Sequence, residues 1–113
     1  MPSAEGAWAG EVGTAEGNIP LRIGILADGL VEVRLANGPP VSVPAVASRR
    51  WDLRLSAPLQ LPTADARLNS PGFGLELRAE QDRLAGRAVA FKDGDRDGLL
   101  GAYLVHACTL HPR

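Results

Sequence analysis

An alternation of apolar and polar residues with a period of two is the feature that most constrains this chain. In NIPLRIGIL (residues 18–26), every second residue from Ile19 to Ile25 is aliphatic, and LVEVRL (residues 30–35) repeats the pattern. Successive side chains of a β-strand point to opposite faces, so this period is typical of strands with one buried face. The pair Asp28-Gly29 lies between the two runs, and tight primed hairpin turns prefer such a pair. The two runs are therefore predicted to form a hairpin.

The rest of the chain contains further short alternating runs bounded by proline, glycine and asparagine. The expected strands cover residues 19–26, 30–36, 41–46, 50–56, 64–68, 73–79, 83–91 and 99–110. No stretch has a sustained apolar stripe of helical period, and the nearest rival, residues 78–88, is short and contains Gly86. We expect an all-β, small antiparallel up-and-down barrel of about eight strands, because closure leaves no exposed strand edges. A β-sandwich is the alternative.

Length, charge and cysteine content bound the class of protein. The 113 residues predict one domain, 1–113, in which residues 1–6 are expected to be disordered. A net charge of −1 gives no electrostatic footprint for nucleic acid or an anionic membrane. The single cysteine excludes an internal disulfide. Neither a signal peptide nor a membrane-spanning apolar run is visible, so we expect a soluble protein, either cytoplasmic or a mature or excised piece of a longer one.

The stretch DGDRDG (residues 93–98) is the one candidate for a metal site. Asp93, Asp95, Asp97 and Gly98 match positions 1, 3, 5 and 6 of an EF-hand calcium loop. Position 12, which should be a bidentate glutamate, is Leu104, and both flanks are strand-like. Aspartate and glycine also crowd ordinary turns, because they tolerate left-handed backbone. We therefore expect a polar turn, with a weak Ca²⁺ site as the alternative and no other cofactor.

Catalytic patterns are weak. His106 and Cys108 resemble a base and its nucleophile, but residues two apart on a strand project in parallel, and no third orienting residue is evident. We expect a core cysteine and a hydrogen-bonded histidine. Nearly every aspartate and glutamate falls in a turn or on an outward strand position, which argues against hydrolytic catalysis by paired carboxylates.

The barrel interior is the expected place for a ligand. Trp51 shares the face of Leu53 in the strand expected at 50–56, so it is predicted to be buried inside the barrel. An exposed Trp51 beside Arg49 and Arg50 would instead indicate a surface binding patch. The candidate ligand-binding residues of the interior are Trp51, Leu53, His106 and Cys108.

Six segments carry a resemblance to a known family: WAGEV, GNIPLRIGI, DGLVEVRL, TADARL, DRLAGRAVAF and LLGAYLVHACTL. Their order resembles the lipocalin- or streptavidin-like accessory barrel at the C-terminus of many bacterial serine hydrolases of the β-lactamase and penicillin-binding type. The resemblance covers almost the whole chain. The family's catalytic Ser-x-x-Lys and Tyr-x-Asn motifs belong to a preceding domain and are not present here. The resemblance therefore implies the fold and an accessory role, and no hydrolase activity.

Two classes of function remain. The favoured one is a non-catalytic barrel, either an accessory or a small-molecule-binding module. The alternative is a lipocalin-like barrel enzyme of the cyclase or isomerase type, which shapes an apolar substrate in its lumen. It requires an open lumen, and an eight-stranded barrel is near the size at which side chains alone fill the interior. The expected partner is a serine-hydrolase catalytic domain or a small apolar ligand, and neither nucleic acid nor membrane.

Overall fold

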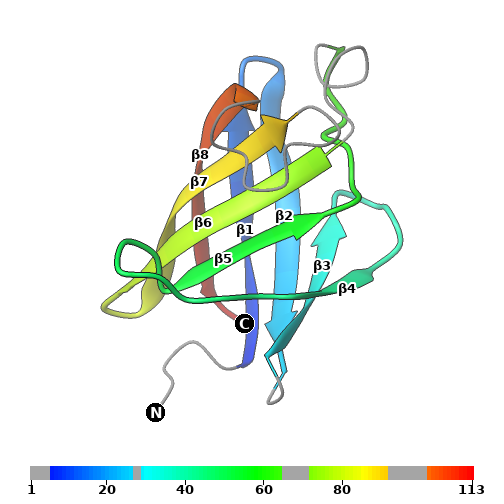
Figure 1. Ribbon diagram of the computed structural model, residues 1–113. Coiled ribbons are helices and arrows are strands. Elements are labelled where there is room, and N and C mark those ends of the chain that lie inside the picture. Colours follow the sequence, from blue (N-terminus) through cyan, green and yellow to red (C-terminus); the bar gives the residue numbers. More distant parts are fainter. Residues whose placement is uncertain (1–5, 27–28, 65–71, 92–101) are drawn as a thin grey trace.

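The computed structural model describes residues 6–26, 29–64, 72–91 and 102–113 and shows an all-β protein. Its eight antiparallel strands form one sheet (Figure 1). They are β1 (Gly6–Thr14), β2 (Gly17–Ile25), β3 (Leu30–Leu35), β4 (Val41–Pro44), β5 (Leu53–Ala57), β6 (Gly72–Glu80), β7 (Arg83–Phe91) and β8 (Ala102–Pro112). Within the described ranges, no helix has the length and apolar composition needed to cross a bilayer.

The sheet closes on itself almost completely. Each strand pairs with its neighbour in the chain within two meanders, β1–β4 and β5–β8, and β1 also pairs with β8. At the remaining seam, between β4 and β5, Val46 and Arg54 exchange two backbone hydrogen bonds of 3.0 and 2.9 Å. The expected up-and-down barrel is confirmed, and this seam is its weakest pairing.

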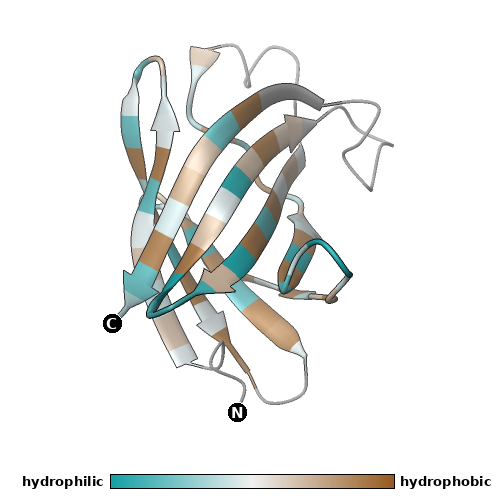
Figure 2. Ribbon diagram, turned by 90° about the vertical axis from the view of Figure 1, so that its left-hand side faces the viewer, coloured by the Kyte–Doolittle hydropathy of each residue, from teal (hydrophilic) through white to brown (hydrophobic). Residues whose placement is uncertain are grey.

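Alternation fills the interior of the barrel with apolar side chains. Bands of opposite hydropathy follow one another along the strands in Figure 2. The buried cluster draws on all eight strands and on the segment after β5: Trp8, Val12, Ile19, Leu21, Ile23, Val31, Val33, Leu35, Val43, Leu53, Leu55, Ala57, Leu61, Phe73, Leu75, Leu77, Leu84, Ala88, Ala90, Cys108 and Leu110.

Two inward positions are glycines, because neighbouring backbone occupies the space of a side chain. A Cβ at Gly10 would overlap the carbonyl oxygen of Thr109, and a Cβ at Gly86 would overlap that of Glu76. Glycine at such points lets a strand bend sharply as a small barrel curves round. The two glycines therefore support closure.

The structure differs from the sequence predictions at several points. The N-terminal expectation was wrong at Gly6, which begins β1, and residues 1–5 lie outside the described residues. The strand expected at 64–68 lies almost wholly outside them as well. In the first hairpin, the Leu26 N–H donates to the Leu30 carbonyl oxygen, so three residues separate the paired positions where a primed turn has two. Gly29 ends that connection with φ +87°, a left-handed conformation that glycine adopts without strain.

Candidate functional site

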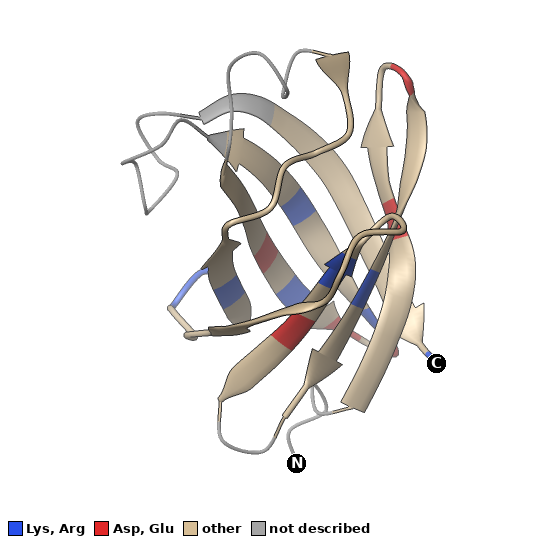
Figure 3. Ribbon diagram, turned by 90° about the vertical axis from the view of Figure 1, so that its right-hand side faces the viewer, with Lys and Arg blue, Asp and Glu red and all other residues tan. Residues whose placement is uncertain are grey.

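A row of three charged side chains crosses the outer face of the barrel. Arg54, Glu76 and Arg87 are direct cross-strand neighbours on β5, β6 and β7, and Figure 3 shows positive positions flanking a negative one on these strands. The Glu76 carboxylate binds Arg54 Nε through Oε2 at 3.1 Å and Arg87 Nε through Oε1 at 2.6 Å. The Glu76 side chain is only 8% exposed, against 28% and 35% for its two partners. Each oxygen of this nearly buried carboxylate thus has a guanidinium partner.

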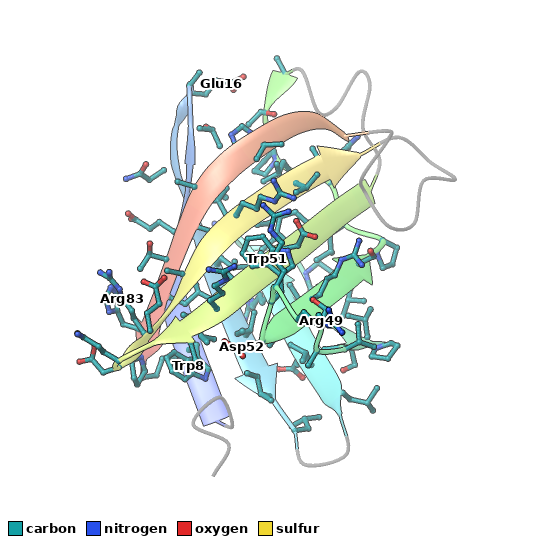
Figure 4. The ribbon with its side chains drawn as sticks, turned by 60° about the vertical axis from the view of Figure 1, so that its left-hand side comes forward. Trp8, Glu16, Arg49, Trp51, Asp52 and Arg83 are labelled. Atoms are coloured by element: carbon teal, nitrogen blue, oxygen red, sulfur yellow. The ribbon has the colours of Figure 1, made fainter. Side chains whose placement is uncertain are left out.

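Trp51 packs over this row, and its expected position inside the barrel was wrong. β5 begins at Leu53, and a turn precedes it, in which the Ser48 N–H donates to the Trp51 carbonyl oxygen at 2.8 Å. The alternation therefore does not extend to residue 51. The half-buried indole lies over β6 and β7 (Figure 4). The guanidinium carbons of Arg78 and Arg87 are each 5.4 Å from its ring centroid, and that of Arg50 is 6.0 Å away.

Hydrogen bonds to β6 hold the segment that carries Trp51. The Asp52 carboxylate accepts the Ala79 N–H at 2.7 Å, and the Asp52 N–H donates to the Leu77 carbonyl oxygen at 2.9 Å. Arg78 Nε donates to the carbonyl oxygen of Arg50 at 2.6 Å. Trp51 and the arginines around it are therefore positioned by backbone contacts before any partner binds.

Positive charge dominates this cluster, which we define as Arg50, Trp51, Arg54, Glu76, Arg78 and Arg87. Its four arginines face one carboxylate, whereas the whole chain carries a net charge of −1. In the part of the chain that the structure describes, neither Arg50 nor Arg78 has a carboxylate within ion-pair distance. We call this set the arginine–tryptophan cluster. Its chemistry is that of an anion-binding surface.

The four residues predicted to line the barrel interior do not all lie there. Leu53 and Cys108 lie in the buried core, and His106 lies opposite Ala88, on the same face of β8 as Cys108. Burial raises the pKa of the Cys108 thiol to about 12. This side chain is therefore a neutral thiol at neutral pH and a poor nucleophile.

The hydrogen bonding of His106 differs from the prediction. It is half-buried, and its buried Nε2 has no hydrogen-bond partner among the residues that the structure describes. The expectation of a hydrogen-bonded histidine was therefore wrong for this atom. Trp51 lies on the opposite face of the sheet, so the four predicted interior residues do not form one site.

The candidate Ca²⁺ site belongs to another part of the chain. Asp93, Asp95 and Asp97 lie outside the described residues. Among the residues that the structure describes, no three histidine, cysteine, aspartate or glutamate side chains are grouped to hold a metal ion.

A shallow hollow lies beside the cluster, on the outer face of β1 and β8. Its lining includes the small residues Ala9, Gly13 and Ala107, and its volume is about 640 Å³. Ala107 is the cross-strand neighbour of Arg87, so the hollow continues the row Arg54–Glu76–Arg87 across the barrel. Glu11 lies in its lining and accepts a hydrogen bond from Asn18 Nδ2 at 3.0 Å.

Compared with family models, curated proteins and solved structures, the chain shows no significant match. The resemblance to the accessory barrels of serine hydrolases therefore rests on the sequence pattern.

Proposed function

We propose that this protein is a non-catalytic β-barrel that acts as an accessory or binding module through its outer face. The observation that carries the proposal is the position of the charged side chains, which lie on the outer face of the barrel. The interior is lined mainly by apolar side chains, together with the neutral Cys108 thiol and the buried Nε2 of His106, while the preorganised charged groups lie outside, around Trp51.

The filled interior argues against the alternative, a barrel enzyme with an apolar substrate in its lumen. Even the small inward residues Ala88 and Ala90 are fully buried, so neighbouring side chains cover the positions that leave most space. Leu61, in the segment after β5, is also fully buried in the core. The N–H of Ala64, three residues on, donates to the Glu16 carboxylate at 3.0 Å, which ties this segment to the β1–β2 turn. An eight-stranded barrel is just wide enough for such packing.

An accessory role agrees with the resemblance to the barrels attached to serine hydrolases, and a catalytic domain of that type is the partner that the resemblance implies. A gene for such a domain, fused to or directly beside the coding sequence, would support this version of the proposal. Its absence from many related genomes would leave a free-standing binding module.

Two measurements test the filled interior. We expect the neutral apolar dye Nile red to show no saturable binding to the folded protein. We also expect Ala88→Leu to lower the free energy of unfolding in urea by about 1–3 kcal/mol, because added methylenes overpack a filled core. The control is Ala107→Leu on the exposed face of β8, with an expected change below about 0.5 kcal/mol. Saturable dye binding together with a neutral or stabilising Ala88→Leu would contradict the proposal and favour the barrel enzyme.

A further inference from the structure

We infer that the arginine–tryptophan cluster binds the carboxylates of an acidic polypeptide segment. The inference rests on the proposed role as a binding module, and it assigns the module's partner by chemical class.

Uncompensated charge is the first argument. Three guanidinium groups gather within 6.0 Å of one indole centroid. Among the described carboxylates, only that of Glu76 lies within ion-pair distance of any of the three, pairing with Arg87, and it is shared with Arg54. Like charges held this close repel one another, and the half-buried ring lowers the screening by water between them. A bound anion relieves that repulsion, so the cluster is electrostatically complementary to a negative partner.

The second argument is the geometry of the donors. Arg87 Nε is fixed by Glu76, and Arg78 Nε is fixed by the Arg50 carbonyl oxygen. The hydrogen bonds that Arg78 and Arg87 donate to the described residues use Nε, and their terminal nitrogens make none to these residues. Guanidinium groups held in this way present paired N–H donors that match the two oxygens of a carboxylate. Since little side-chain freedom is left to lose, binding costs less entropy.

The third argument is a place for the carboxylate. In one row of the sheet, Glu76 lies between Arg54 on β5 and Arg87 on β7. In the adjacent row, the neighbour of Arg78 on β7 is Ala85, which is only partly buried. A partner's carboxylate above the small Ala85 side chain would lie beside Arg78 and diagonally beside Arg87. This position repeats the arrangement that the protein already uses for Glu76.

The distribution of charge favours a polypeptide over a nucleic acid. The positive region is local, and the β6–β7 hairpin beside it carries Glu80 and Asp82. A phosphate backbone with closely spaced charges would meet these carboxylates, and a chain of net charge −1 offers it no extended basic stripe. An acidic peptide places a few carboxylates where they fit. The adjacent hollow over Ala107 and Gly13 offers room for the peptide to continue across the strands.

Fluorescence anisotropy with a fluorescein-labelled peptide of alternating glutamate and glycine tests the inference. We expect saturable binding that weakens as NaCl is raised, because the contacts are charged and partly exposed. Arg78→Gln should weaken binding at least about tenfold, since it removes a charge-assisted contact. Arg78→Lys should recover only part of the loss, because lysine keeps the charge but lacks the paired N–H donors of a guanidinium group. Arg50→Gln, in the exposed turn, provides a second variant with little risk to folding.

The matched control is Arg34→Gln on β3. Arg34 is exposed, and its Nε also donates to a backbone carbonyl oxygen, that of Gly38 at 3.2 Å. We expect its substitution to change the affinity less than about twofold, because it lies outside the cluster. An equal loss in the Arg34 and Arg78 variants would overturn the inference, as would the absence of saturable binding at low salt. Tighter binding of a phosphoserine peptide of equal charge would reassign the site to phosphate. None of these outcomes affects the dye and Ala88→Leu results, so failure of this inference is distinct from failure of the proposed function.

Discussion

Glu76 is the residue on which the outer-face cluster depends. It lies nearly buried between two arginines, so Glu76→Gln removes the counter-charge of both while keeping the shape of the side chain. We expect the free energy of unfolding in urea to fall by about 1–3 kcal/mol. The loss should be smaller than for a fully buried pair, because the arginines are partly exposed and water replaces some of the lost interaction.

Glu80→Gln is the control for that substitution. Glu80 pairs with Arg83 at 3.4 Å, and both side chains are about half exposed, at 47% and 50%. Exposed pairs of this kind contribute little, so a change below about 0.5 kcal/mol is expected. Equal effects of the two substitutions would mean that the burial of Glu76 is not what makes it important.

For single residues, the sequence predicts which face of a strand a side chain lies on, but not which residues of the next strand lie beside it. Arg54, Glu76 and Arg87 alternate with the inward residues of their strands, so a period of two gives all three outward positions. Nothing in a single strand indicates that these three become direct neighbours, since cross-strand register depends on turn lengths and on the pairing of strands. Trp51 shows the opposite failure. It continued the alternation of β5 in the sequence, but the chain turns at Ser48–Trp51 before the strand begins.

At the scale of the elements, Gly86 decides how closely β7 approaches β6. A Cβ at this position would overlap the carbonyl oxygen of Glu76, which is backbone and cannot rotate away. Gly86→Ala should therefore lower the free energy of unfolding by about 3 kcal/mol or more, at the upper end of overpacking costs. Urea denaturation monitored by circular dichroism measures it.

Gly24→Ala on β2 is the matched substitution without a clash. A Cβ at Gly24 would meet nothing within 4 Å, so its stability should stay within about 0.5 kcal/mol of the parent protein. If both substitutions were neutral, the close approach of β6 and β7 would not limit the structure. In the sequence, Gly86 only counted against a helix. Its structural reason, a neighbouring carbonyl group, becomes visible once two strands are paired.

On the scale of the whole molecule, the sequence was sufficient for the class of fold and insufficient for the details of closure. Alternation along most of the chain predicted the eight-stranded barrel, because each strand needs one buried face. The order of the strands follows the tendency of strands that are consecutive in the sequence to pair with each other. The seam between β4 and β5 was not predictable, because its closure depends on one bridge formed outside the alternating runs, between Val46 and Arg54.

That seam gives a prediction about local stability. β7 and β8 pair from Leu84–Leu110 to Phe91–Ala102, whereas the seam has a single bridge. Segments with few hydrogen bonds open locally at a smaller free energy than the global transition. In native-state hydrogen exchange followed by NMR, the amides of Val46 and Arg54 should therefore exchange faster than the hydrogen-bonded amides of β7 and β8. Their exchange should also depend less on denaturant.

The seam and the candidate site meet at Arg54, whose backbone forms the bridge and whose guanidinium binds Glu76. Saturating the protein with the glutamate–glycine peptide should therefore slow exchange at Arg54 more than at the amides of β8, because the ligand stabilises the closed state alone. The peptide should have no such effect on the Arg78→Gln variant. Equal protection of every amide would indicate that the barrel opens only by global unfolding and that the seam is as stable as the other strand pairs.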